Sequence, residues 1–307
     1  MSLEASDIID IASPGDATPS VAPSKFVDFY ELTKPRMNFL VVLTTLVGFY
    51  MAGEARGLDW RRLAVTVIGT ALTAAGASVL NQFSERRLDA LMPRTRNRPL
   101  PAGRVAPIEA LGYGIALGVA GVAILATRIN TLTALLGAIT LLTYVLLYTP
   151  LKRFTTLNTV IGAVPGAIPP VMGFTAVHGA LSPAAMVVFA ILFVWQMPHF
   201  LAIAILYRRD YAMAGFKMLP VVDEDLSVTG RQIVLYSTAL IPVSLMPVYV
   251  NLAGQAYYAI ALMLGLAFLS FGVSCAASKT RVDARKLFFA SIIYLPALLG
   301  VMMLDKR

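Results

Sequence analysis

The sequence predicts an all-α membrane protein that crosses the bilayer several times. Of its 307 residues, 58% are hydrophobic and only 14% are charged, and the mean hydropathy is +0.74. A soluble domain carries about 25% charged residues, because it must cover its core with polar surface. The apolar residues form continuous runs rather than alternating with polar ones, which favours helices over a barrel. A soluble enzyme, a disordered chain and a disulfide scaffold are therefore excluded, and Cys275 is the single cysteine.

The chain begins with a polar, turn-forming stretch and continues with nine apolar runs. We expect residues 1–24 to form a disordered cytoplasmic tail and residues 25–307 to form one membrane-embedded domain. Each run is long enough to cross about 30 Å of hydrocarbon as a helix. The approximate limits of the runs are 37–53, 62–83, 106–127, 131–149, 157–177, 183–206, 231–251, 255–276 and 287–304. The fifth run contains Pro165, Pro169 and Pro170, so we expect this helix to be kinked or broken where its backbone faces protein.

The positive charges of the sequence are distributed unequally between the two ends of these helices. Nineteen of the 25 lysines and arginines lie in the N-terminal approach and in the even-numbered loops, and six lie on the other side. Basic loops remain in the cytoplasm. The asymmetry predicts a cytoplasmic N-terminus, and nine spans then place the C-terminus outside.

A row of oxygen-bearing side chains ends the second predicted helix. Asn81, Glu85 and Asp89 are spaced four residues apart, so they share one helix face. Such side chains would be costly facing lipid, and carboxylates with phosphate oxygens are the ligands that Mg²⁺ prefers. The alternative is a solvated helix end paired with Arg86 and Arg87.

Basic residues follow this row on the same side of the membrane. The next loop carries four arginines, among them Arg94 and Arg98, and the fourth loop adds Lys152 and Arg153. Arginine forks match phosphate oxygens, so carboxylates followed by arginines suggest a diphosphate site, although anionic lipid headgroups would fit an arginine cluster equally. Asp210 begins a second acidic and basic cluster after the sixth helix.

Polar residues within the predicted spans are few. Gln196 and His199 lie about one helical turn apart in the sixth span, beside Pro198. A single histidine is more often a hydrogen-bonded core residue than a ligand, but the pairing with a glutamine beside a proline makes both residues candidates for a functional site.

Taken together, these motifs resemble the protohaem IX farnesyltransferases (haem O synthases) of the UbiA superfamily of intramembrane prenyltransferases. The superfamily pattern is carried by Asn81-(x)3-Glu85-(x)3-Asp89. More specific to the haem branch are the strings Met92-x-Arg94-Thr-x-x-Arg98-Pro, Tyr148-Thr-x-x-Leu151-Lys-Arg-x-Thr155, Asn158-Thr-(x)2-Gly162-(x)2-Pro-Gly-Ala167, Trp195-Gln-Met-Pro-His-Phe200 and Asp210-Tyr-x-x-Ala-Gly215-x-x-Met-Leu-Pro220. One departure is Glu85, where the superfamily usually has aspartate.

The resemblance implies a fold of nine helices around a central cavity and the transfer of farnesyl from farnesyl diphosphate to the 2-vinyl group of protohaem (haem B). It implies Mg²⁺ held by Asn81, Glu85, Asp89 and Asp210, which would also be the catalytic residues. Arg94, Arg98, Lys152 and Arg153 would bind the diphosphate, and His199 with Gln196 would contact haem. A bacterial inner membrane location is expected, with a haem A synthase or a terminal oxidase as a partner and no nucleic acid.

Two rival functions remain open at this point. A related enzyme could prenylate an aromatic acid or a chlorophyll-type ring, although the strings around His199 and Asp210 argue against it. A transporter of an anionic lipid or metabolite would bind its ligand without forming a product. Transporters place their polar groups near the membrane midplane, whereas here the polar groups gather at one face.

Overall fold

The computed structural model describes residues 24–53 and 57–307; most of the predicted tail, residues 1–23, lies outside this part. Nine helical segments of the described chain are long and apolar enough to cross a membrane. They are α2 (Pro35–Ala52), α3 (Trp60–Asp89), α4 (Pro107–Arg128), α5 to α6 (Thr131–Leu151), α7 (Asn158–His178), α8 (Pro183–Leu206), α11 (Ser227–Tyr249), α12 (Gln255–Ser278) and α13 (Arg281–Leu304). The prediction of a polytopic all-α membrane protein is confirmed.

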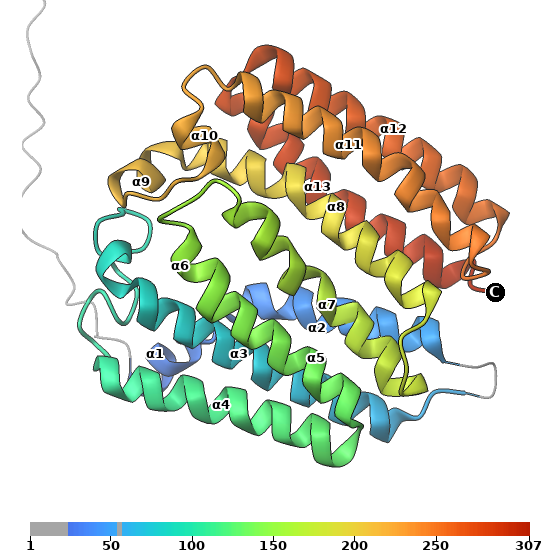
Figure 1. The fold of residues 1–307 in the computed structure, drawn as a ribbon, viewed down its shortest axis with the longest axis horizontal. Coiled ribbons are helices and arrows are strands. Elements are labelled where there is room, and N and C mark those ends of the chain that lie inside the picture. The colour runs from blue at the N-terminus through green and yellow to red at the C-terminus, as the bar shows by residue number, and fades with distance from the viewer. Residues whose placement is uncertain (1–23, 54–56) are drawn as a thin grey trace, which may run out of the picture.

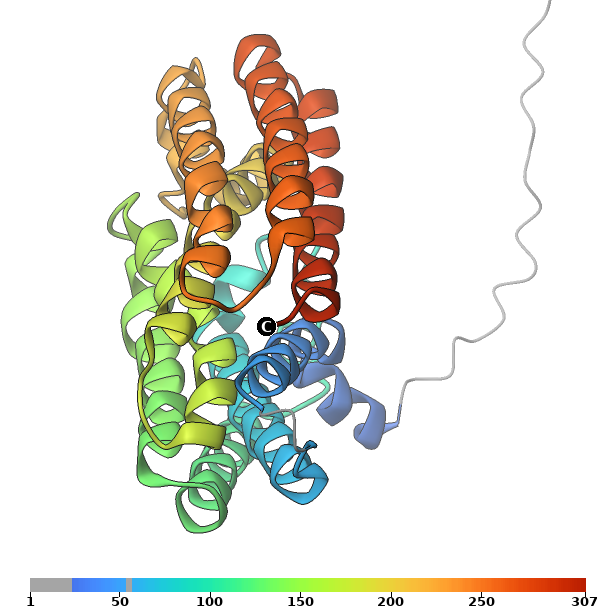
Figure 2. The same cartoon turned by 90° about the vertical axis from the view of Figure 1, so that its right-hand side faces the viewer.

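The helices form two groups that meet along α7 and α8 (Figure 1). In the first group, α2, α3 and α5 pack against α7, and α4 packs against α3 and α5. In the second group, α11 and α13 pack against α8, and α12 packs against α11 and α13. A second, smaller contact between α2 and α13 closes the arrangement, with the C-terminus beside it (Figure 2). Large apolar side chains such as Ile115, Val119, Leu135 and Leu146 are exposed on the outer surface. Exposure on this scale marks a lipid-facing surface, so the chain is a multi-pass membrane protein.

Small residues allow the central helices to approach one another closely. A Cβ on Gly173 of α7 would overlap the backbone of Thr45 in α2, and a Cβ on Gly48 would overlap the carbonyl of Pro170. Glycines at helix interfaces serve this purpose in membranes, where packing rather than water drives association. Of the kink or break expected in the fifth span, the break is absent, since α7 is one continuous helix despite its three internal prolines.

Short elements lie together at one end of the bundle, opposite the C-terminus (Figure 1). They are α1 (Lys25–Leu32), α9 (Arg208–Met213) and α10 (Leu219–Val222). The loop after α3 packs against α9 and α10 through a buried apolar cluster that includes Met92, Phe216 and Met218. This end therefore brings together the basic loops that the sequence places on one side of the membrane.

The fourth span changes helical type near the same end. It runs as α5 (Thr131–Leu142), then as a π-helical segment (Thr143–Tyr148), and finally as the short α6 (Thr149–Leu151). Such π-helical turns occur frequently at functional sites, because the extra residue re-aims the side chains that follow. Here the residues that follow are Thr149 and Lys152.

Candidate active site

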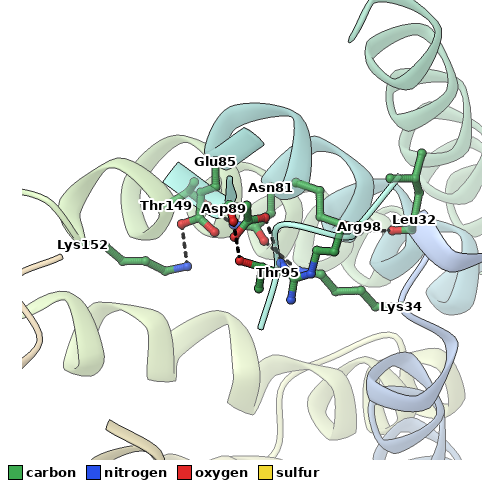
Figure 3. A network of polar contacts seen from close by, with 10 residues as sticks. Leu32, Lys34, Asn81, Glu85, Asp89, Thr95, Arg98, Thr149 and Lys152 are labelled. Atoms are coloured by element: carbon green, nitrogen blue, oxygen red, sulfur yellow. Dashed lines mark hydrogen bonds and ion pairs between the residues drawn. The ribbon is translucent and has the colours of Figure 1, made fainter. Parts of the chain in front are cut away.

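The last turns of α3 carry the predicted row of oxygen ligands, and the row faces inward (Figure 3). Asn81, Glu85 and Asp89 are 1%, 6% and 2% exposed. The alternative of a solvated helix end paired with Arg86 and Arg87 is therefore wrong, because all three side chains are buried and neither arginine forms an ion pair with them in the described structure. Burial of two carboxylates requires compensating charge or hydrogen bonds.

Each member of the row receives a cationic donor from a different segment of the chain (Figure 3). Lys34, between α1 and α2, donates from Nζ to Asn81 Oδ1 at 2.8 Å. Lys152, just after α6, donates to Glu85 Oε1 at 2.7 Å. Arg98, from the loop after α3, donates to Asp89 Oδ2 at 2.8 Å. Three cations thus gather beside three oxygen ligands at one membrane face.

The two lysines of this set have opposite pKa shifts. Burial lowers the pKa of Lys34 to about 7, and the nearby Arg98 guanidinium acts in the same direction. Burial also acts to lower the pKa of Lys152, but the Glu85 carboxylate together with Tyr148 and Tyr144 outweighs it, and the pKa lies above the usual range of a lysine. An additional anion next to Lys34 would favour its charged form. When Lys34 is charged, three cations face two carboxylates, which leaves one positive charge for a bound anion.

Hydrogen bonds from uncharged groups also fix the row of Asn81, Glu85 and Asp89. Asn81 Nδ2 donates to Thr149 Oγ1 at 3.1 Å, and Thr149 Oγ1 donates to the carbonyl of Tyr144 at 2.8 Å. Thr95 Oγ1 donates to the backbone carbonyl of Asp89 at 2.7 Å. The π-helical segment and the loop after α3 therefore both fix the direction in which the ligands point.

Arg94 and Asp210 lie beside this row rather than in contact with it. The Arg94 guanidinium stacks over the ring of Tyr207 at 4.5 Å and lies 5.8 Å from that of Tyr211. Asp210 lies between these tyrosines in the sequence, in the first turn of α9. Within the described residues, no three acidic, histidine or cysteine side chains are grouped closely enough to hold a metal ion, so Asp210 does not join Glu85 and Asp89 in such a group. The two acidic segments thus pack together through apolar side chains, but their carboxylates do not form one group.

Arg153 points to a different place from its neighbour Lys152. It is exposed and lines a pocket of about 480 Å³ with both charged and apolar residues in its wall. Other residues that line this pocket are Ser84, Glu85, Arg86, Arg87, Leu88, Thr149, Pro150 and Phe154. Glu85 is shared, since it lines the pocket and accepts from Lys152. The four residues predicted to bind diphosphate therefore fall into two pairs. Arg98 and Lys152 contact the oxygen row, whereas Arg94 and Arg153 do not.

The two residues predicted to contact haem also differ in their surroundings. Gln196 is buried between α7 and α8, where Nε2 donates to the carbonyl of Ala163 at 2.7 Å. His199 is half-buried and faces α13, where its Nδ1 lies 2.6 Å from Ser291 Oγ. Gln196 thus fastens two helices together, whereas the histidine retains a ring nitrogen for other contacts.

The family of the chain follows from comparison with known proteins. Residues 41–293 match the UbiA prenyltransferase family, and the chain belongs to that family. It is 47% identical to the protoheme IX farnesyltransferase of Solibacter usitatus, over 91% of this chain and 98% of the relative. It is 43% identical to the protoheme IX farnesyltransferase of Myxococcus xanthus, over 92% and 96% of the two chains. The resemblance inferred from the motifs is confirmed, and the chain is a prenyltransferase.

Solved structures share the fold at low sequence identity. A digeranylgeranylglyceryl phosphate synthase aligns with a TM-score of 0.74 at 16% identity, covering 91% of this chain and 98% of that one. A UbiA homologue from Archaeoglobus fulgidus, bound to GPP and Mg²⁺, aligns with a TM-score of 0.64 at 18% identity, covering 90% and 99%. The fold class is therefore confirmed.

Two residues of the site were missed by sequence reasoning. Lys34 was counted only as a charge that sets topology, yet it contacts Asn81. Thr149 was part of a motif without an assigned role, yet its hydroxyl accepts a hydrogen bond from the side-chain amide of Asn81. Lys34 has a positive φ of 49° directly before Pro35. A left-handed lysine at a helix start is unusual, but the sequence does not reveal that conformation.

Proposed function

We propose that this chain transfers a farnesyl group from farnesyl diphosphate to the 2-vinyl group of protohaem IX, producing haem O and diphosphate. The observation that carries the proposal is the buried row of Asn81, Glu85 and Asp89 with a cation against each member. Similarity over nearly the whole chain to protoheme IX farnesyltransferases supports the choice of substrates. The separation of the polar groups from the midplane argues against a transporter.

The donor set fits a divalent cation such as Mg²⁺. Two carboxylates and an amide oxygen share one face of α3, and within the described residues no larger cage of acidic, histidine or cysteine side chains exists. Mg²⁺ is usually held by one or two carboxylates together with phosphate oxygens and waters. When bound, the metal would neutralise charge on the diphosphate. Asn81, Glu85 and Asp89 would hold it, and Asp210 is proposed to approach from α9 once the substrate is present.

The cations beside the row would stabilise the leaving group. Ionisation breaks the bond between C1 of farnesyl and its oxygen, and the electron pair leaves with the diphosphate. Lys34, Arg98 and Lys152 are already placed to receive that charge, and preorganised donors of this kind contribute strongly to catalysis. Arg94 and Arg153 are proposed to guide the diphosphate to or from the site.

The remaining steps form one carbon–carbon bond and one carbon–oxygen bond. The terminal carbon of the vinyl group attacks C1 of farnesyl, which leaves a positive charge on the inner vinyl carbon. Water adds there and loses a proton to a nearby base, giving the hydroxyethyl group. Apolar helix surfaces behind the row would keep water away from the allylic cation until attack. We propose that His199 contacts the haem. We also propose that the protein lies in the inner membrane of a bacterium, with its site open to the cytoplasmic side.

The test uses purified protein with farnesyl diphosphate, Mg²⁺ and one of two acceptors, protohaem or 4-hydroxybenzoate. Mass spectrometry of the haem should show the gain of one farnesyl and one hydroxyl group, with release of diphosphate. Transfer to 4-hydroxybenzoate with none to haem would assign the chain to a different acceptor. Binding of farnesyl diphosphate without transfer to either acceptor would contradict the proposed reaction.

A further inference from the structure

The ring of His199 is held rigidly between two aromatic side chains. It stacks on Trp195, one turn earlier in α8, with ring centroids 5.0 Å apart and planes 20° apart. On its other side lies Phe288 of α13, with centroids 5.2 Å apart and planes 27° apart. The indole Nε1 of Trp195 donates to the backbone carbonyl of Ser291 at 3.0 Å. The imidazole therefore has one orientation relative to α13.

A serine beside this ring determines which imidazole nitrogen carries the proton. Ser291 Oγ donates to the carbonyl of Phe288 at 2.6 Å, and His199 Nδ1 lies 2.6 Å from the same Oγ. A hydroxyl has a single proton but two acceptor lone pairs. Because that proton is directed at Phe288, the bond to His199 requires Nδ1 to be the donor. In the neutral ring, Nε2 then carries a lone pair.

The lone pair on Nε2 is not consumed by the protein. Nε2 of His199 makes no hydrogen bond to a described residue. The fully buried side-chain polar atoms without a partner are, within the described chain, the hydroxyls of Thr70 and Ser237. Since Nε2 is not among them, it reaches accessible space. An unprotonated nitrogen cannot donate to a haem propionate, but it can coordinate iron.

We propose that Ser291 is a positioning residue that holds His199 in the Nδ1–H tautomer, so that Nε2 coordinates the iron of the haem substrate. This inference rests on the proposed function, because it needs haem as the acceptor. A hydrogen bond donated by the other ring nitrogen of a ligating histidine fixes the ring and raises its basicity. Loss of such a partner typically weakens metal binding by about 10–100-fold.

The experiment is a haem titration of the purified, detergent-solubilised protein. Absorption spectra give the affinity for protohaem, and resonance Raman spectra of the ferrous complex report the iron–histidine bond. Ser291→Ala should weaken haem binding by roughly 10–100-fold and weaken the iron–histidine signal. Ser291→Thr keeps the hydroxyl and should restore both. The Michaelis constant for farnesyl diphosphate should remain unchanged in each variant.

Ser270 provides a matched control on α12. Its Oγ donates to the carbonyl of Ala267 at 2.7 Å, three residues earlier, just as Ser291 donates to Phe288, but it faces outward without a histidine. Ser270→Ala should leave haem affinity and spectrum unchanged. Ser291→Cys, nearly the same size with a weaker acceptor, gives a second test should the alanine variant lose its fold.

The outcomes distinguish failure of the proposed function from failure of the role proposed for Ser291. Wild-type protein that binds no haem would contradict the proposed function itself. An iron–histidine signal that persists in His199→Ala would remove His199 as the ligand and overturn the inference. A signal lost in His199→Ala but unchanged in Ser291→Ala and Ser291→Cys would overturn the positioning role alone. Lower turnover of Ser291→Ala with an unchanged spectrum would also overturn it, because it would point to proton transfer instead.

Discussion

Asp89→Asn separates the catalytic role of a buried carboxylate from its structural role, because the chain contains a matched ion pair elsewhere. Asp89 is 2% exposed at its side chain and pairs with Arg98, which is 27% exposed, at 2.8 Å. Asp28 is 3% exposed and pairs with Arg104, also 27% exposed, at 2.8 Å. The second pair joins α1 to the loop after α3 and lies outside the oxygen row. The two carboxylates are thus matched in burial and in distance to their arginine, although Arg104 also lies 3.6 Å from Glu31. Only Asp89 belongs to the proposed metal site.

The expected cost to stability is similar for both asparagine variants. A charge-assisted hydrogen bond contributes about 1.5–3 kcal/mol and a neutral one about 0.5–1.5 kcal/mol. Asparagine keeps the acceptor oxygen, so each variant should lose about 1 kcal/mol, the difference between these two kinds of bond. The expected loss of activity is different. Removing one electrostatic stabiliser of a developing charge lowers turnover by roughly 10²–10³-fold, which should apply to Asp89→Asn alone.

The assay is haem O formation measured by chromatography and mass spectrometry at saturating Mg²⁺ and farnesyl diphosphate. Apparent melting temperatures of both variants are recorded in the same detergent. Asp28→Asn should melt earlier than the wild type and retain turnover, whereas Asp89→Asn should melt equally early and lose turnover. Equal activity of the two variants would refute the reasoning that Asp89 belongs to the site.

Three further predictions follow from other parts of the structure. Lys152→Met should raise the Michaelis constant for farnesyl diphosphate about tenfold or more, as expected for loss of a charged hydrogen bond. Arg153→Gln should raise the same constant less, because Arg153 guides the diphosphate without holding it at the row; the reverse order would place the diphosphate in the outer pocket. Gly173→Ala should lower the free energy of unfolding by about 1–3 kcal/mol, because its Cβ would overlap the backbone of Thr45. Gly112→Ala, whose Cβ meets open space, should not destabilise, and equal melting of the two variants would contradict the packing argument. Chelation of divalent cations should abolish turnover and weaken farnesyl diphosphate binding, and full activity after exhaustive chelation would exclude the metal.

Local patterns in the sequence were sufficient to predict the helices and the oxygen row. The limits of the apolar runs agree closely with the helices, because a bilayer demands continuous apolar helices of a definite length. The row on α3 followed from a spacing of four residues, which places side chains on one helix face. Both inferences depend only on the geometry of a single helix.

The partners of the row could not be predicted, because they depend on contacts between distant segments. Lys34 is 47 residues from Asn81, and Lys152 is 67 residues from Glu85. Lys152 and Arg153 are adjacent in sequence, yet one reaches Glu85 and the other lines the outer pocket. The chain after the π-helical turn sets the directions of the Lys152 and Arg153 side chains. These directions cannot be predicted from any periodicity in the sequence. The role of Ser291 is likewise visible only once α13 lies beside α8.

The most direct test of the central claim is a structure of this chain with Mg²⁺ and a farnesyl thiodiphosphate that cannot ionise readily. The account predicts the metal against Asn81, Glu85 and Asp89, and the diphosphate in contact with Lys34, Arg98 and Lys152. A diphosphate bound instead in the pocket lined by Arg86, Arg87 and Arg153, with the row on α3 still paired only to its own cations, would contradict it.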